Sequence, residues 1–353
     1  MTNSSRTVLD VKALPSVSEF GFRGGRDSFR TFTKQIFETD IRFLRSDDRL
    51  VVFRHADLRA LAINPRMGNV PAGQLFKRLR VAAEMSGYDG AIGSRLVGDA
   101  LGGGFANQFF FNNEPLHTPL RMMMLKQIGP KGLPAIGRIA ASTAEEIVEG
   151  IPREQEIDFF KDVAARFAVG FWGEVVGLSP DEKKAVEALL HSMAPAFSLK
   201  RNLEIFRNTD DAFAAYFGII ERAALRSLTR PGEGGVVQAL QAELESMSIE
   251  GDPDTTGIVP RNAGGMLAGV LTDGFHTAAI AMTNVAYVLS RLPDVRTALR
   301  ASPELWPAAI SEALRVESPV IQLDRYTLED VEYDDVVIPA GTGVIMMWAA
   351  GNL

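Results

Sequence analysis

The sequence contains no cysteine and only four histidines among its 353 residues. The lack of cysteine excludes disulfide bridges, cysteine nucleophiles, thiolate-bound clusters and zinc fingers from this chain. No uncharged apolar stretch approaches the length of a membrane span. The polar start at Met1 also lacks the apolar core of a secretory signal. These absences lead us to expect a cytoplasmic protein with no membrane anchor.

Acidic side chains outnumber basic ones. The chain has 37 Lys and Arg against 44 Asp and Glu, which gives a formal net charge of −7. This balance argues against a nucleic-acid partner, because such proteins need a basic surface to neutralise phosphates. Apolar residues make up 46% of the chain, which is enough for a large folded core. We see no internal repeat and no linker, so we predict a single domain over residues 1–353.

Apolar residues recur every three or four positions through much of the chain, which predicts amphipathic helices. We expect helices at His55–Asn64, His117–Ile128, Leu133–Gly150, Phe159–Val176, Pro180–Ala194, Arg207–Leu228, Val236–Glu245 and Pro307–Val316. The run Arg261–Leu292 is apolar on nearly every face, so we expect a central helix surrounded by others.

Strand-like segments lie near both ends of the chain. They are Asp48–Phe53, Val320–Tyr326, Val331–Ile338 and Gly343–Trp348. The glycine-rich stretch Pro71–Asn113 includes the aromatic run Phe109–Phe111 and is expected to be a loop that packs over another part of the protein. The predicted fold class is therefore mainly α with small β-sheets.

Two short patterns place charged residues on a single helix face. His117 and Arg121 are four residues apart, so both can bind one anionic group, although an exposed, hydrated pair is the alternative. Glu312 and Arg315 are three apart and are expected to pair. Arg325 follows in the segment LDRYTLEDVEYDDVVIPAGTGV.

A further pattern lies in the long apolar helix, which contains Asp273, Gly274, His276 and Thr277. A glycine and a threonine within a buried helix can simply permit close packing. In this order with the other three patterns, however, the helix resembles helix I of the cytochrome P-450 family, the haem-thiolate monooxygenases. The resemblance covers roughly residues 15–353 and implies the P-450 fold, incomplete at its C-terminal end.

The resemblance also implies roles for individual residues. His117, Arg121 and Arg325 would bind the haem propionates, and Glu312 with Arg315 would form a structural pair. Gly274 would leave room for dioxygen, and Thr277 with His276 would deliver protons. The substrate would be a small, mainly apolar molecule, with Asp273 contacting one polar or basic group. The implied lining consists of Val270, Asp273, Val320, Ile321 and Gln322.

In this family a cysteine thiolate holds the haem iron, and this chain has none. No residue is therefore assigned as a metal ligand. Two interpretations stay open. The chain is a fragment of a monooxygenase that receives electrons from a ferredoxin or flavodoxin-type partner, or it is a haem-free relative that acts as a scaffold or activator for another enzyme. The anion-binding residues His117, Arg121 and Arg325 favour the fragment, since a scaffold has no obvious use for them.

Overall fold

The computed structural model describes most of the chain. The described residues are 6–23, 26–70, 91–92, 95–96, 100, 107–129, 133–193, 203–229, 235–252, 256–257, 259–260 and 262–353. Contacts divide the chain into two compact units. The first unit consists of Met1–Val70 with Asn284–Leu353, and the second consists of Pro71–Thr283. We describe each unit by itself.

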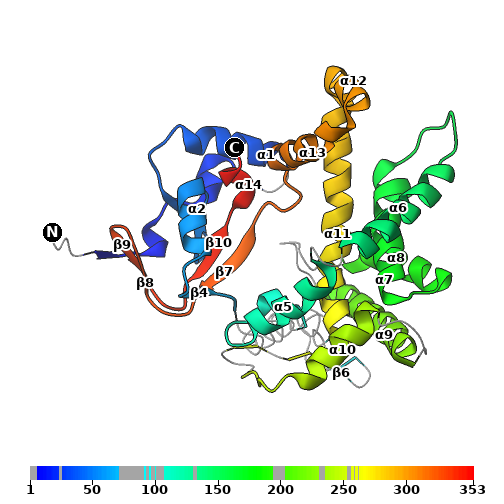
Figure 1. The fold of residues 1–353 in the computed structure, drawn as a ribbon. Coiled ribbons are helices and arrows are strands. Elements are labelled where there is room, and N and C mark those ends of the chain that lie inside the picture. Colours follow the sequence, from blue (N-terminus) through cyan, green and yellow to red (C-terminus); the bar gives the residue numbers. More distant parts are fainter. Residues whose placement is uncertain are drawn as a thin grey trace. The chain divides into compact units, whose positions relative to one another are not determined.

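The first unit contains two β-sheets (Figure 1). A five-stranded sheet has the order β2-β3-β10-β7-β4, and a three-stranded sheet has the order β1-β9-β8. The β3–β10 and β1–β9 pairs are parallel, and the other pairs are antiparallel. The strands are β1 Thr7–Val8, β2 Phe43–Ser46, β3 Arg49–Val52, β4 Met67–Gly68, β7 Leu323–Thr327, β8 Val331–Tyr333, β9 Val336–Ile338 and β10 Gly343–Met346.

Apolar side chains cover both faces of the five-stranded sheet. Because side chains alternate along a strand, Val51 faces a cluster that includes Phe32 of helix α1, whereas Leu50 faces a cluster that includes Leu58 of helix α2. A strand buried on both faces needs a continuous apolar run, as Leu50–Phe53 supplies. The helices of this unit are α1 Arg26–Phe37, α2 His55–Ala62, α12 Pro293–Ala301, α13 Trp306–Val316 and α14 Trp348–Gly351, with 3-10 turns at Val11–Ala13, Val17–Phe20 and Pro303–Leu305.

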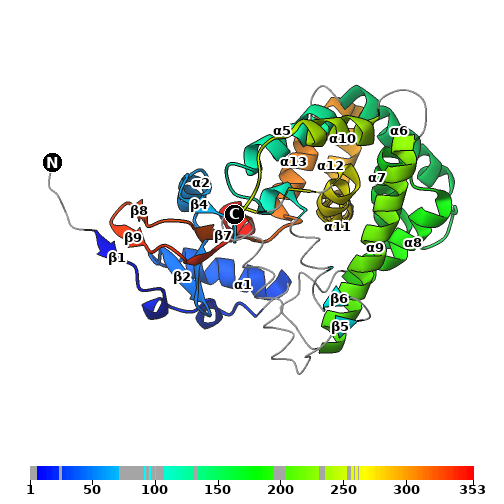
Figure 2. The same cartoon turned by 90° about the horizontal axis from the view of Figure 1, so that it is seen from below.

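The second unit is a bundle of helices (Figure 2). Its helices are α5 His117–Ile128, α6 Leu133–Glu149, the π-helix η4 Phe159–Ala165, α7 Arg166–Val176, α8 Pro180–Met193, α9 Leu203–Thr229 and α10 Val236–Ser246, with a 3-10 turn at Phe109–Phe111. The long helix α11, Ala263–Ser290, belongs to this unit up to Thr283 and to the first unit from Asn284. The strands β5 Ala91–Ile92 and β6 Arg95–Leu96 form a short hairpin.

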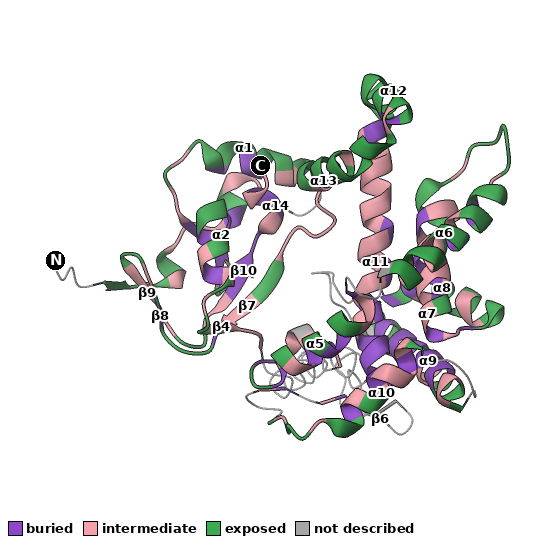
Figure 3. Ribbon diagram, viewed as in Figure 1, coloured by how far each residue is buried: buried purple, intermediate pink, exposed green. Residues whose placement is uncertain are grey.

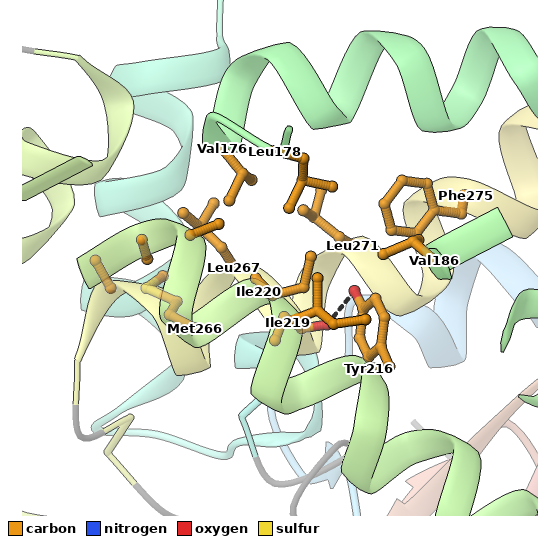
Figure 4. Packing of buried hydrophobic residues seen from close by; sticks show 14 of the residues in the cluster. Val176, Leu178, Val186, Tyr216, Ile219, Ile220, Met266, Leu267, Leu271 and Phe275 are labelled. Carbon is orange, nitrogen blue, oxygen red and sulfur yellow. Dashed lines mark hydrogen bonds between the residues drawn. The ribbon is translucent and has the colours of Figure 1, made fainter. Parts of the chain in front are cut away.

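The core of the second unit lies between α7, α8, α9 and α11 (Figure 4). Leu267, Leu271 and Phe275 of α11 are fully buried and belong to one cluster with Tyr216 and Ile220 of α9. Figure 3 shows that α11 changes along its length from buried to half-buried. The expected central helix is therefore confirmed for its first half and is less enclosed in its second half.

Most predicted helices begin and end within a few residues of the observed ones, and α5 matches at both ends. Two predictions need correction. Val331–Ile338 is a hairpin of β8 and β9 and not one strand, because Asp334 takes a left-handed conformation with φ 54° that reverses the chain. Val320–Gln322 precedes strand β7 and is not part of it. No helix among the described ranges has the length and apolar character needed to cross a membrane.

Candidate functional site

Helix α5 places His117 and Arg121 on one face, as the four-residue spacing predicted. The His117 ring is half-buried against Phe109, with 6.3 Å between ring centroids. Its Nδ1 lies 3.5 Å from a carboxylate oxygen of Glu114. Burial raises the pKa of Glu114, but hydrogen bonds from Thr118 and the contact with His117 outweigh it and leave this pKa below its usual value.

Arg121 is exposed and makes no hydrogen bond or ion pair within the described part of the chain. Its guanidinium group is therefore a cation with unused donors, one helical turn after a histidine. A guanidinium presents paired donors that match a carboxylate, so binding of an anion by this pair stays a prediction that the geometry allows.

Helix α11 holds the residues expected to act in oxygen chemistry, and it is α-helical over its whole length. At Gly274 a Cβ atom would lie 3.1 Å from Nε1 of Trp172 in α7. The indole therefore occupies the space beside this glycine. This contact supports close packing as one reason for the glycine, and a role for Gly274 toward dioxygen stays a proposal.

The two polar side chains that follow Phe275 are held differently. The Thr277 hydroxyl donates to the carbonyl of Asp273, one turn earlier in the same helix. The His276 Nε2 lies 2.9 Å from the carbonyl of Leu190 in α8. A carbonyl only accepts, so Nε2 carries the hydrogen and the Nδ1 of the neutral ring remains an acceptor. His276 can thus take up a proton at Nδ1 without losing its contact with α8.

Asp273 is the single Asp, Glu, Lys or Arg in α11. Burial raises the pKa of its carboxyl from 3.8 to about 6, and no cation offsets that effect. The side chain forms no hydrogen bond with any described residue. Asp273 therefore stands out from the apolar helix around it and is a candidate for contact with a ligand.

In the first unit, Arg325 lies on β7 between β10 and β4. It is half-buried, and its guanidinium donates to the carbonyl of Asp324 at 3.0 Å and toward Asn69 at 3.4 Å. Burial lowers the pKa of Arg325, and the nearby Asp324 offsets only part of this effect. No described carboxylate forms an ion pair with it, so Arg325 can also accept an anionic ligand.

The expected pair of Glu312 and Arg315 is present in helix α13. Two hydrogen bonds of 2.8 Å join the guanidinium to both carboxylate oxygens, and a third donor of Arg315 bonds to the carbonyl of Asn352. The hydrogen bonds from Arg315 lower the pKa of Glu312. The pair therefore ties helix α13 to the segment that follows strand β10, which agrees with a structural role.

The residues implied to line a substrate pocket come from both units. Val320, Ile321 and Gln322 are half-buried in the first unit, where the Ile321 carbonyl accepts a hydrogen bond from the Ala349 N–H at 3.0 Å. Val270 is half-buried in the second unit. Much of the expected loop at 71–113 lies outside the described residues, namely 71–90, 93–94, 97–99 and 101–106.

Two polar residues of the second unit were not singled out by sequence reasoning. The Tyr216 hydroxyl, fully buried in α9, donates to the carbonyl of Ala268 at 2.9 Å, which is the bond drawn in Figure 4. Gln108 is fully buried, and neither atom of its amide has a hydrogen-bond partner. Single polar residues beside aromatic ones carry no periodic signal, so the sequence offered nothing to detect them.

Known proteins resemble this chain over part of its length. The Cytochrome P450 family profile matches residues 191–352. Over this range the chain is similar to the cytochrome P450 family. The linalool 8-monooxygenase of Pseudomonas putida is 27% identical over 247 residues, which cover 69% of this chain and 58% of that protein. Cytochrome P450 CYP199A2 of Rhodopseudomonas palustris is 26% identical over 239 residues, which cover 67% of this chain and 55% of the relative.

The fold of this chain also matches solved P450 structures. The haem domain of a P450 from Tepidiphilus thermophilus superposes with a TM-score of 0.72 at 15% identity, over 95% of this chain and 78% of that one. The predicted fold class is thereby confirmed. The aligned part of the chain spans less than two thirds of the length of the first curated relatives, at 58% and 55%.

The residues present fit only part of a haem group. Arg121 in the second unit and Arg325 in the first are both cations without carboxylate partners among the described residues, and each guanidinium by itself suits a carboxylate such as those of haem. The chain cannot supply the thiolate ligand of the iron, because it has no cysteine. The described ranges also contain no cluster of His, Asp and Glu that could hold a metal ion.

Proposed function

We propose that this protein is the larger part of a haem-dependent monooxygenase that inserts one oxygen atom into a small, mainly apolar organic substrate. The observation that carries the proposal is the occurrence of four charged or polar motifs, in the family's order, on elements of a P450 fold. The relatives named as monooxygenases support the same reaction type.

In this proposal, bound haem supplies the oxidising chemistry, and the protein supplies binding, orientation and proton delivery. Arg121 and His117 would bind one propionate, and Arg325 would bind the other. The axial thiolate would come from a part of the native protein outside these 353 residues, which contain no cysteine. Electrons would come from a ferredoxin or flavodoxin-type partner, and we propose that the reaction takes place in the cytoplasm.

Proton delivery is assigned to Thr277 and His276. The Thr277 hydroxyl is held on the Asp273 carbonyl, and the Nδ1 of His276 is available to accept a proton. Replacing Thr277 with alanine is expected to lower the product formed per oxygen consumed, while oxygen consumption continues. Thr283→Ala is the matched control, because its hydroxyl makes the same bond to a carbonyl one turn earlier in α11. An unchanged yield in Thr277→Ala would refute the assignment.

The first measurement is the absorbance spectrum of the reduced protein under carbon monoxide, purified from its native gene. A red-shifted thiolate band supports the monooxygenase. A folded protein without a haem band supports the second candidate, a haem-free scaffold or activator for a partner enzyme, which the lack of cysteine favours.

Binding of the propionates has its own test. Replacing Arg121 and Arg325 together with alanine is expected to reduce haem retention during gel filtration. The control replaces Arg138 and Arg300, two exposed arginines on α6 and α12. Equal haem retention in both double variants would show that Arg121 and Arg325 do not hold the propionates.

A further inference from the structure

Asp273 is an isolated charge in an apolar environment. The nearest hydroxyls are already committed, because Thr277 donates to the Asp273 carbonyl and Tyr216 and Thr272 both donate to the Ala268 carbonyl. Burial is the main cause that raises the pKa of the Tyr216 phenol, and the carboxylate of Asp273 raises it further, so the two side chains lie close together. No described residue satisfies the carboxylate.

The direction of the Asp273 side chain follows from helix geometry. Side chains in an α-helix tilt toward its N-terminus, so Asp273 covers the turn that contains Gly269, four residues earlier. Gly269 has no side chain, and another segment uses that space: a Cβ atom there would lie 2.7 Å from the carbonyl carbon of Asn107 and 2.9 Å from the backbone nitrogen of Gln108. The segment at Asn107–Gln108 therefore packs against the same turn of α11.

Gln108 adds a second unsatisfied polar group at this place. Its side chain has no exposed surface, and both Oε1 and Nε2 lack a partner. An unpaired buried amide costs about 1–3 kcal/mol and is rare in folded proteins. Asp273 on α11 and Gln108 on a segment that packs against α11 at Gly269 thus both carry unsatisfied side chains.

We propose that Asp273 and Gln108 form a recognition site for the protonated amino group of a small organic ligand. An ammonium group donates several hydrogen bonds and carries the charge that the carboxylate lacks, so it can bind the carboxylate and Oε1 of Gln108 together. Nε2 of Gln108 remains available to an acceptor atom on the same ligand. The inference extends the proposed function, since the ligand would be the substrate, and it narrows the substrate class to amines.

Calorimetric titration of the native protein at pH 7.5 with n-octylamine and 1-octanol tests this inference, because the two probes differ only in the polar group. A charge-assisted hydrogen bond is worth about 1.5–3 kcal/mol, so the amine should bind about ten- to hundredfold more tightly than the alcohol. Asp273→Asn should abolish that preference, and Gln108→Leu should weaken it. Asp294→Asn, which removes an exposed charge from α12, should leave it unchanged.

The inference is overturned if the parent protein shows no preference, or if Asp273→Asn retains it, as amine binding to a haem iron would. Haem absorbance measured on the same samples separates this result from the proposed function. A thiolate-ligated haem without amine preference refutes only the amine site. Amine preference without haem refutes only the monooxygenase.

Discussion

Replacing Asp273 with asparagine is expected to stabilise the protein. Raising the pKa of a carboxyl from 3.8 to about 6 corresponds to about 3 kcal/mol, since each factor of ten in acid dissociation is worth about 1.4 kcal/mol. This cost opposes folding at any pH above the folded-state pKa, where the carboxylate is charged. Asparagine removes the charge but still buries an amide, so we expect a gain of about 2 kcal/mol at pH 8.

The gain should depend on pH with a defined sign. Because the folded state raises this pKa, the folded protein binds the proton more tightly, and the cost disappears as the pH falls from about 6 to 3.8. The difference in unfolding free energy between Asp273→Asn and the parent should therefore be large at pH 8 and small at pH 4. Taking the difference largely cancels the titration of groups that both proteins share and that do not contact Asp273.

Urea unfolding followed by tryptophan fluorescence provides the assay. Trp172 packs beside Gly274 and reports on the unit that holds Asp273. Replacing Trp306 and Trp348 with phenylalanine in both proteins leaves Trp172 as the single tryptophan. A variant that is no more stable than the parent at pH 8, or a gain that persists at pH 4, would refute the burial of an unpaired carboxylate.

Two further predictions concern packing and charge. Gly269→Ala should destabilise the protein by about 2 kcal/mol, because the added methyl group meets the backbone of a neighbouring segment at 2.7 Å. Gly265→Ala is the control: its nearest contact is 3.4 Å, so this substitution should be neutral or slightly stabilising. Arg42→Ala should lower the free energy of unfolding by about 2–3 kcal/mol, because it leaves the buried Asp57 without its cation. Arg6→Ala breaks an exposed pair and should lower it by less than about 1 kcal/mol. Urea unfolding measures the stability of all four variants.

The sequence predicts a helix or strand well where a local pattern of apolar, proline or glycine residues marks its position. Helix α5 was predicted correctly at both ends, because Pro119 falls in its first turn and Gly129-Pro130 follows its last turn. Helix α12 at Pro293–Ala301 was missed although Val295, Ala298 and Leu299 follow helical spacing, because Pro293-Asp294 was interpreted only as the end of the preceding helix and not as the start of another. The β8–β9 hairpin was interpreted as one strand because apolar residues lie on both sides of Asp334-Asp335, although this pair of aspartates interrupts the alternation and forms the turn.

The contacts of the candidate site also fall into two groups, those that the sequence predicts and those that it does not. The His117–Arg121 and Glu312–Arg315 pairs were predictable, because helical spacing alone brings such residues together. The contacts of Gly274 with Trp172 and of Gly269 with Asn107 were not, because each joins helix α11 to a segment distant in sequence. Whether a buried polar group such as Gln108 finds a partner is decided by tertiary packing, which no local pattern records.

Two charges of opposite sign oppose folding in this protein, one in each unit. Burial lowers the pKa of Arg325 and raises that of Asp273, and neither side chain forms an ion pair with a described residue. Unpaired, partly buried charges are costly, so a protein that only needed a stable scaffold would gain by losing both. A haem carboxylate for Arg325 and an amino group for Asp273 would each offset one of these costs, which is why a ligand-binding enzyme accounts for both residues better than a haem-free scaffold does.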